Sequence, residues 1–442
     1  MERYAKYQDS GIAWLGEIPE HWECIKFKRL TPIKRGASPR PIADPVYFDP
    51  DGEYAWVRIA DVTASERYLE TTTQKLSELG KSYSVSLEPD ELFLSIAGSV
   101  GKPIITKIKC CIHDGFVYFP NLKANKEFIY YIFSTGQPYL GLGKLGTQLN
   151  LNTDTVGGIE IGLPPLEEQK LIAAYLDRKT AEIDELIAQK ERLIALYEEE
   201  KTAIINEAIT KGINPDVKLK PTAIDWLGDI PKHWKIQKLR FFVSKIEQGW
   251  SPSCHNYPVS KDEWGILKVG CVNGDYFNQE ENKSLPIEMK PKTQYEIKDG
   301  DILISRANTK ELLGSAAIVV DLRLKLIFCD KLYRIITKYE VNKNYLIRYL
   351  RSSLARFQYE REATGTSISM QNIGQDTIKN LIIPFPPIEE QKTIAKYIEK
   401  EIARIDAKIA KTKRIIELQK EYRTALISEA VTGKIKIPDL VS

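Results

Sequence analysis

Two long segments of the chain carry hydrophobic residues at the spacing of an amphipathic helix. Residues 167–211 contain no glycine or proline, and their apolar positions recur at heptad-type intervals. This spacing predicts a helix with one continuous apolar seam. The members of the seam are Ile172, Leu176, Ile183, Leu186, Leu193, Tyr197 and Ile204. Pro164 and Pro165 precede the segment and Gly212 follows it, as expected at the ends of a helix.

A second long segment near the C-terminus keeps part of this seam. It retains Ile394, Ile398, Ile405, Ile415 and Leu426, replaces two members by Lys408 and Gln419, and adds a flanking stripe of Ile402, Ile409 and Ile416. We expect the stripe to supply additional apolar docking surface. At about 1.5 Å per residue, about 44 residues form a rod of about 66 Å. Because such a rod is not stable alone in water, we expect the two helices to pack together in antiparallel fashion.

The remaining segments, 1–145 and 214–364, alternate short apolar runs with turn residues, which predicts β-strands. The runs are AWVRIADV, ELFLSI, FVYF, GILKVGCV, DILIS, SAAIVV and LYRIIT. Each segment ends in an aromatic-rich helix candidate, EFIYYIF or NYLIRYLRSSLARFQYE. The predicted fold class is therefore α+β.

The sequence repeats itself over almost its whole length. Residues 12–22, IAWLGEIPEHW, return at 224–234 as IDWLGDIPKHW, with eight of eleven positions identical. The segment LPPLEEQKLIAAYLD, which begins at Leu163, is matched by FPPIEEQKTIAKYIE, which begins at Phe385, an offset of 222 residues. Between these blocks, IKRGASP resembles IEQGWSP and PDELFLSIA resembles DGDILISRA, in the same order. A period of this length implies two whole domains related by duplication.

Each half of the repeat consists of a variable domain followed by a long helix. We expect a first globular domain at 1–145, a first spacer region at 146–213, a second globular domain at 214–364 and a second spacer region at 365–442. The predicted architecture is two similar globular domains separated by a pair of long antiparallel coiled-coil helices, with pseudo-twofold symmetry. Such symmetry suits a DNA duplex, whose backbone has local twofold axes.

The charge distribution adds weak support for a nucleic-acid partner. The 442 residues carry a net charge of only +3, from 63 Lys+Arg and 60 Asp+Glu. Residues 212–364 contain 25 basic and 19 acidic residues, whereas 1–146 contains 18 of each. The second half thus offers the clearer footprint for phosphates. Ordinary solvation of the surface explains the same counts equally well.

Several functional classes are disfavoured. Six cysteines form no CxxC pair, and with four histidines the spacing fits neither a disulfide framework nor a zinc site. The string AGSVGKP at 97–103 has Pro103 where a phosphate loop needs Ser or Thr, and NLIIPFPP at 380–387 lacks the Asn-Pro of a methyltransferase. We expect no cofactor, no metal and no catalysis. We also expect no membrane span or signal peptide, and therefore the cytoplasm as the compartment.

The repeated tryptophan motif admits two interpretations. Trp14, Trp22 and His21 return as Trp226, Trp234 and His233. We interpret these rings as packing groups that fasten the leading segment, rather than as direct ligand contacts.

The two WLG-x-IP-x-HW copies and the paired PPLEEQKLIAAYLD and PPIEEQKTIAKYIE segments resemble the specificity subunits of type I restriction-modification systems. The resemblance covers nearly the full length. It implies two target-recognition domains that each read half of a split site on double-stranded DNA. It also implies helices that act as a spacer and dock two methyltransferase subunits, with the restriction subunit joining that assembly. The chain itself would be non-catalytic.

Candidate DNA-contacting residues lie in polar turns of the two variable domains, where Arg and Lys suit phosphates or guanine and Asn and Gln suit adenine. They are Lys34, Arg35, Ser38, Arg40, Arg58, Ser95, Ser99 and Lys102 in the first domain, and Gln248, Trp250, Ser251, Lys268, Ser305, Arg306, Asn308 and Lys310 in the second. Weaker candidates are Lys144, Thr147, Gln148, Thr366 and Ser367. A stand-alone DNA-binding structural or regulatory protein with the same scaffold is the alternative function. A self-sufficient restriction enzyme would need the motifs that are missing.

Overall fold

The computed structural model describes residues 2–142, 151–260, 263–338, 340–367 and 370–438. The chain forms two compact units. Unit 1 comprises Met1–Glu191 and Arg414–Ser442, and unit 2 comprises Arg192–Lys413. Each unit therefore combines one globular part with the beginning of one long helix and the end of the other.

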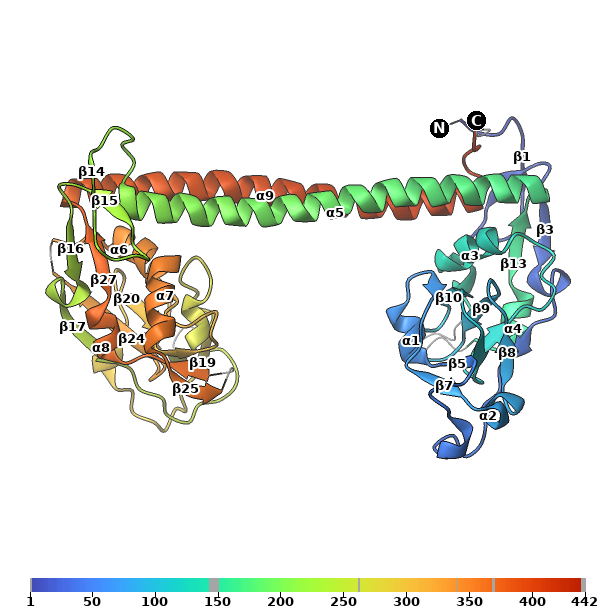
Figure 1. Ribbon diagram of the computed structural model, residues 1–442, viewed down its shortest axis with the longest axis horizontal. Coiled ribbons are helices and arrows are strands. Elements are labelled where there is room, and N and C mark those ends of the chain that lie inside the picture. The colour runs from blue at the N-terminus through green and yellow to red at the C-terminus, as the bar shows by residue number, and fades with distance from the viewer. Residues whose placement is uncertain (1, 143–150, 261–262, 339, 368–369, 439–442) are drawn as a thin grey trace. The chain divides into compact units, whose positions relative to one another are not determined.

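The two long helices are α5 (Leu166–Lys211) and α9 (Ile388–Val431), coloured green and red in Figure 1. The predicted helix at 167–211 is thus confirmed to within one residue. Acidic residues occupy the first turn of each helix, where the helix dipole favours negative charge. Gly212 and Gly433 follow the two helices with φ of +76° and +70°, a left-handed conformation that glycine adopts at little cost.

Within each unit the two helices pack against each other and run in opposite directions. In unit 2, Lys408 Nζ of α9 lies 5.1 Å from the ring centroid of Tyr197 of α5. One turn further along α5, Lys201 Nζ lies 2.9 Å from Asp406 Oδ1, so the α9 number falls as the α5 number rises. The predicted antiparallel pairing is confirmed within the unit.

The two units use the same interhelical ion pair. In unit 1, Arg423 Nε of α9 donates to Asp184 Oδ1 of α5 at 2.9 Å. At the offset of 222 residues, Arg423 corresponds to Lys201 and Asp184 corresponds to Asp406. The duplicated sequence therefore pairs the start of each helix with the end of the other through equivalent charges.

The predicted seam is buried where the helices meet the globular parts. Buried members include Ile172, Leu176 and Ile183 in unit 1 and Ile394, Ile398 and Ile405 in unit 2. The flanking stripe is buried too, with Ile402, Ile409 and Ile416 only 4%, 6% and 7% exposed. The expectation that this stripe supplies exposed docking surface is wrong. Ile402 belongs to the same core cluster as Tyr345 of the globular part, so the wider seam serves internal packing.

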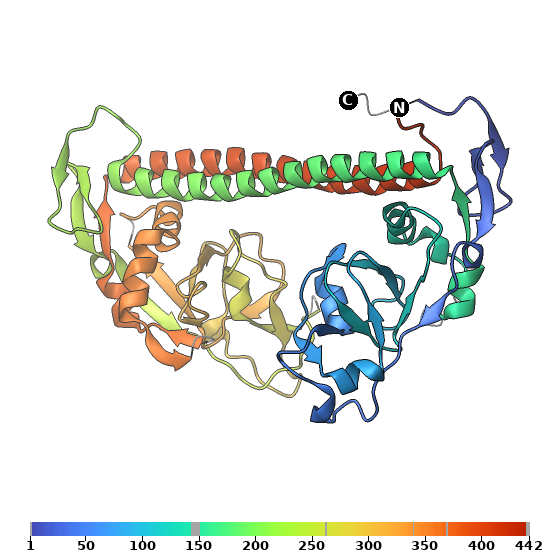
Figure 2. The ribbon, with the colours of Figure 1, turned by 45° about the vertical axis from the view of Figure 1, so that its right-hand side comes forward.

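The globular part of unit 1 contains two main sheets, with strand orders β4-β12-β9-β10-β6 and β7-β5-β11-β8. The strands are β4 (Lys34–Arg35), β5 (Tyr54–Val57), β6 (Tyr68–Leu69), β7 (Gln74–Leu76), β8 (Val85–Leu87), β9 (Leu92–Ser95), β10 (Pro103–Thr106), β11 (Cys110–Ile112) and β12 (Phe116–Tyr118). Helix α3 (Lys126–Ser134) lies between the larger sheet and α5, as Figures 1 and 2 both show. Its buried aromatic residues join the sheet to the helices.

Unit 2 repeats this arrangement with strand orders β17-β24-β20-β22 and β19-β18-β23. The strands are β17 (Val243–Gln248), β18 (Trp264–Leu267), β19 (Asn282–Ser284), β20 (Ile302–Ser305), β22 (Ala316–Ile318), β23 (Lys325–Ile327) and β24 (Leu332–Thr337). Helices α6 (Lys343–Leu350) and α7 (Ser353–Glu362) cover them. The order matches that of unit 1 except that β6 and β8 have no counterpart in these two sheets, so the α+β class is confirmed and the sequence repeat is largely a repeat of the fold.

Short antiparallel pairs flank each globular part. They are β1 (Tyr7–Asp9) with β2 (Glu17–Pro19), β3 (Glu23–Lys26) with β13 (Glu160–Leu163), β14 (Leu219–Pro221) with β15 (Asp229–Pro231), and β16 (Lys235–Lys238) with β27 (Ile382–Phe385). Further short elements are α1 (Ile59–Ala64), α2 (Glu78–Ser82), α4 (Thr153–Gly158), α8 (Gln375–Asn380), β21 (Ala307–Asn308), β25 (Thr364–Ser367) and β26 (Met370–Asn372).

Three predicted elements are divided in the structure. The run AWVRIADV is strand β5 followed by helix α1, because Arg58 N donates to Asp61 Oδ2 at 2.9 Å and this contact starts a helix. The run GILKVGCV is β18 followed by a 3-10 helix at Val269–Val272. The predicted helix NYLIRYLRSSLARFQYE is broken into α6 and α7, because Ser352 caps the second helix by accepting from Ala355 N.

The repeated tryptophan motif clamps the first turn of each long helix. Glu168 of α5 accepts from Trp22 Nε1 at 3.1 Å and lies 2.8 Å from His21 Nε2. Glu390 of α9 accepts from Trp234 Nε1 at 2.8 Å in the same way. Both tryptophans are only 1% exposed. The packing interpretation is confirmed for Trp22 and Trp234, whereas Trp14 and Trp226 are only partly buried and His21 and His233 remain exposed beside the glutamates.

A buried glutamine beside that glutamate binds the next element of each unit. Gln169 Oε1 accepts from Asn125 N at 2.8 Å, and its Nε2 donates to Pro164 O at 2.8 Å. Gln391 Oε1 likewise accepts from Asn342 N at 2.8 Å. The two asparagines are the N-caps of α3 and α6. Each long helix is thereby hydrogen-bonded to the helix that covers its sheet.

Substitution of Gln391 by alanine should destabilise the protein by about 1–3 kcal/mol, because it leaves the half-buried N–H of Asn342 and the buried carbonyl of Pro386 without this partner. Urea denaturation followed by circular dichroism measures the change. The control is Lys392→Ala, which removes a neighbouring ion pair with side chains 49% and 77% exposed. It should change stability by less than about 1 kcal/mol. Equal effects of the two substitutions would contradict the role assigned to Gln391.

The two equivalent interhelical cations should differ in their contributions. Lys201 is 13% exposed and binds Asp275 as well as Asp406, whereas Arg423 is 37% exposed and binds only Asp184 among the described residues. Lys201→Ala removes a mostly buried ammonium group and both of its ionic hydrogen bonds, and should cost about 1–2 kcal/mol, because Asp275 and Asp406 stay 45% and 42% exposed. Arg423→Ala should cost less than about 1 kcal/mol. Hydrogen exchange of α5 and α9 peptides would measure both, and the opposite ranking would refute the assignment.

Candidate nucleic-acid interface

In each unit, a glycine directly after the edge strand of the larger sheet allows a polar loop to pack against a turn between two other strands. A Cβ atom on Gly36 would lie 2.3 Å from His113 O, and one on Gly249 would lie 2.1 Å from Phe328 O. Such distances leave no room for any side chain. The chain after β4 in unit 1, and after β17 in unit 2, can therefore approach this turn only because it begins with glycine.

Each loop is fastened to an aspartate at the tip of that turn, in an arrangement that we call the aspartate clasp. In unit 1, Ser38 Oγ donates to Asp114 Oδ1 at 3.1 Å, and Arg35 Nε donates to the main-chain carbonyl of Asp114. In unit 2, Ser251 Oγ donates to Asp330 Oδ1. Two domains with little local identity thus build the same contact between an edge loop and a turn.

The clasp of unit 2 also engages Gln248, whose Nε2 donates to the carbonyl of Asp330 at 3.3 Å. Arg306 adds a weaker contact, with Nη1 3.5 Å from the same carbonyl and Nε donating to Tyr333 Oη at 3.1 Å. The structure therefore brings Arg306 to the loop that carries the predicted site residues Gln248 and Ser251, more than 50 positions away in the sequence. Trp250 of the same loop lies 4.7 Å below Lys292 Nζ in a cation–π contact.

A hollow of about 880 Å³ opens beside the clasp of unit 1. It is lined by Ser38, Arg40 and Arg58 and by the rings of Trp56 and His113. Arg40 is 79% exposed and holds only a 3.3 Å contact to the clasp carboxylate, so most of its donors are free. Burial lowers the pKa of His113, which favours a neutral ring in the wall of the hollow. Two guanidinium groups and aromatic walls make this hollow suited to a nucleic-acid ligand.

Three predicted contacts are buried and do not face solvent. Ser95 and Ser305 are 0% exposed and donate to Ala97 O and Leu312 O, carbonyls of their own turns. Asn308 is 8% exposed, and its amide donates to Asn273 Oδ1 and to the backbone. These side chains hold loops in shape, because a polar group that leaves water needs an internal partner. We do not retain the three as DNA contacts.

The remaining candidates lie at the surface with varied partners. Lys34 is exposed on β4, and Lys268 is partly exposed next to the 3-10 helix of unit 2. Ser99 Oγ lies 2.6 Å from Thr63 Oγ1. Lys310 Nζ lies 3.9 Å from Glu360 and is 53% exposed. These positions are compatible with phosphate contacts but are not joined to either clasp.

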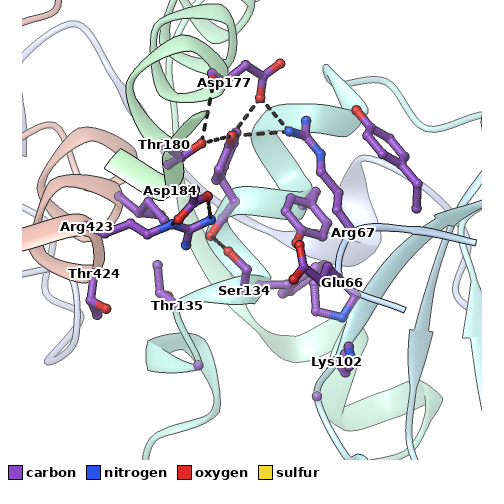
Figure 3. A pocket seen from close by; sticks show the side chains of 18 of the residues that line it. Glu66, Arg67, Lys102, Ser134, Thr135, Asp177, Thr180, Asp184, Arg423 and Thr424 are labelled. Carbon is purple, nitrogen blue, oxygen red and sulfur yellow. Dashed lines mark hydrogen bonds and ion pairs between the residues drawn. The ribbon is translucent and has the colours of Figure 1, made fainter. Parts of the chain in front are cut away.

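Lys102 is more constrained than its sequence context indicated. Its Nζ donates to the carbonyls of Thr63 and Ser65, and burial lowers its pKa. It lines a pocket of about 970 Å³ in unit 1 (Figure 3). Since its ammonium group already has two carbonyl partners, Lys102 primarily closes the loop between β5 and β6.

Arg67, which lines the same pocket, joins the globular part of unit 1 to α5 (Figure 3). Arg67 Nη1 lies 2.5 Å from Asp177 Oδ1, and Nη2 binds Glu127 of α3. Tyr131 Oη donates to the same Asp177 oxygen at 2.6 Å. With Arg67 only 16% exposed, this cluster is a structural fastening rather than a ligand site.

Sequence reasoning missed the aspartates that organise both loops. Asp114 and Asp330 each follow a buried strand and precede the next strand, in the strings CIHDGFVYF and IFCDKLYRI. The sequence signal that could have identified these two aspartates is an acidic residue at the corresponding turn of each half. Lys144, Thr147 and Gln148 lie outside the described residues, and β25 contains Thr366 and Ser367, whose side chains are likewise outside the description.

Across the part of the chain that the structure describes, no three or more His, Cys, Asp or Glu side chains are grouped to hold a metal ion. In the same residues, no helix has the length and apolar character that a membrane crossing requires.

Comparison with known proteins gives concordant sequence matches. The chain is 31% identical over 173 residues to the type I restriction enzyme EcoEI specificity subunit of Escherichia coli, a match that covers 39% of this chain and 29% of that protein. It is 24% identical over 437 residues to the MjaVIII specificity subunit of Methanocaldococcus jannaschii, covering 96% of this chain and 95% of that protein.

Solved structures share the fold. The HsdS subunit from Thermoanaerobacter tengcongensis superposes with a TM-score of 0.55 at 18% identity, covering 95% of this chain and 98% of that one. A chain from a structural study of type I R-M complex assembly superposes with a TM-score of 0.70 at 17% identity, covering 95% and 99%. The family model of the type I restriction modification DNA specificity domain matches twice, at residues 19–195 and 256–419. The chain belongs to this family of type I restriction-modification DNA specificity proteins.

Proposed function

We propose that the chain is the non-catalytic, DNA-reading subunit of a type I restriction-modification complex, and that it recognises a two-part site on duplex DNA. The proposal assigns one reader to residues 1–145 and the other to 214–364, with spacer regions at 146–213 and 365–442. It retains as DNA contacts Lys34, Arg35, Ser38, Arg40, Arg58, Ser99, Lys102, Gln248, Trp250, Ser251, Lys268, Arg306 and Lys310. Since the ligand is cellular DNA, the proposal places the chain in the cytoplasm.

The observation that carries the proposal is the pair of aspartate clasps. Both units hold an exposed edge loop on an aspartate turn with the same hydrogen bonds, yet the loops present different side chains. Unit 1 offers arginines, whereas unit 2 offers a glutamine and a tryptophan. Two different half-sites require the same loop arrangement with different exposed side chains, because sequence is read by side chains at base edges.

We further propose that the helices dock two methyltransferase subunits and, through them, the restriction subunit. Leu196 of α5 and Leu418 of α9 are equivalent at the offset of 222 residues, and they are 50% and 46% exposed. Large apolar side chains on the outer face of a helix support a partner surface. Their duplication supports two equal docking sites.

The purified chain should neither methylate nor cleave DNA, because catalysis is assigned to the partners. With its methyltransferase subunits it should direct methylation to one two-part sequence. Mapping of methylated bases in DNA from cells that carry the intact system, compared with cells that lack only this chain, measures this. Methylation or cutting by the chain alone would overturn the non-catalytic assignment, and unchanged methylation without the chain would overturn the DNA-reading assignment.

Lengthening both spacer helices should lengthen the gap in the methylated site. Insertion of about two turns, roughly seven residues, after Glu191 in α5 and after Lys413 in α9 adds about 10 Å of helix. At 3.4 Å per base pair, the unspecified gap should grow by about three base pairs while both half-sites stay the same. The control inserts the same residues into α5 alone, which shifts the helices out of register and should abolish methylation. An unchanged gap after the double insertion would show that the helices do not measure the site.

A further inference from the structure

Arg35 and Gln248 occupy the same position in the two units. Each is the last residue of an edge strand, β4 in unit 1 and β17 in unit 2. Arg35 is paired with Val117 of β12, and Gln248 is paired with Tyr333 of β24. Each of these two partners is the second residue of the strand that follows its aspartate turn. Both Arg35 and Gln248 are exposed.

The two side chains also donate a hydrogen bond to the equivalent group, the main-chain carbonyl of the clasp aspartate. Arg35 Nε donates to the carbonyl of Asp114, and Gln248 Nε2 donates to the carbonyl of Asp330. Among the described residues, neither side chain has another hydrogen-bond partner. The turn therefore holds each side chain by one donor and leaves its other polar groups free at the surface.

The free groups differ in a way that matches two different bases. Arg35 keeps both Nη groups, a planar fork of donors that fits the O6 and N7 acceptors of guanine. Gln248 keeps one N–H and the acceptor Oε1, which fit the N7 acceptor and the N6 amino donor of adenine. Because one donor is already bound to the turn, each side chain loses less conformational freedom when it meets a base.

The clasp carboxylates favour a base edge over a phosphate as the target. Asp114 is 42% exposed directly beside Arg35, and Asp330 is partly exposed beside Gln248. A phosphate that approached either turn would meet this negative charge, whereas the edge of a base is neutral. The local electrostatics thus assign these two side chains to reading rather than to backbone neutralisation.

We propose that Arg35 reads a guanine and Gln248 reads an adenine at corresponding positions of the two half-sites. The inference rests on the proposed function, since it names the residues that set the specificity of each reader. It predicts that the two half-sites differ at this position because of one side chain in each unit.

Reciprocal substitution tests the inference with little risk to the fold. Arg35→Gln and Gln248→Arg each introduce a side chain that the other unit already holds on an equivalent turn. In cells where each variant replaces the wild-type chain beside its own methyltransferase subunits, mapping of methylated bases gives the sequence read. Arg35→Gln should change one guanine to adenine in one half-site, with a preference of about tenfold to a hundredfold. Gln248→Arg should make the opposite change in the other half-site.

A binding measurement distinguishes base reading from phosphate contact. If Arg35 neutralised a phosphate, Arg35→Gln would weaken all duplexes about equally and reduce the slope of log affinity against log salt by about one, with the motif unchanged. That result, or a motif unchanged in both variants, overturns the inference while leaving the proposed function intact. If the wild-type chain directs no two-part methylation, the proposed function itself fails. Thermal unfolding of each variant, expected at the wild-type temperature, confirms that the clasp is retained.

Discussion

The hydrogen bonds made by two consecutive side chains at the start of each long helix hold each unit together. Glu168 and Gln169 in unit 1 bind the tryptophan motif and the cap of α3, and Glu390 and Gln391 repeat these contacts in unit 2. The glutamines are 3% and 0% exposed, so their amides have no access to water and must keep these partners. A helix of more than 40 residues gains its stability from packing, and this anchor determines which face it packs.

The anchor explains how the two halves can carry different loops on one frame. The shared strands of the two sheets and the long helices repeat in the same order, while the loops beyond the edge strands differ in length and in side chains. The aspartate clasp is the point where the repeated frame ends and the variable surface begins. Because Gly36 and Gly249 admit no side chain, the backbone path is common to both units and the specificity is left to the residues around it.

The two units nevertheless fasten their globular parts to the helices with different charges. In unit 1, Arg67 reaches from the globular part to Asp177 of α5. In unit 2, Lys201 near the end of α5 reaches Asp275 of the globular part, and Asp275 also binds Arg351. Asp177 lies near the start of α5, so the two contacts are made from positions that are not equivalent in the repeat. Duplication has preserved the packing of the helices and not these ionic contacts to the globular parts.

The two long helices, the duplication and the α+β class can be predicted from the sequence alone, because they depend on periodicity and on repeated motifs that are local in the chain. The sequence also located the polar loops around Arg35 and Gln248. The partners Asp114 and Asp330, the burial of Ser95 and Ser305, and the inward position of Ile402 were decided only by the tertiary structure. Whether a polar side chain is exposed or hydrogen-bonded depends on which strand end, distant in the sequence, packs against it. The spacing of residues along the chain does not specify that contact.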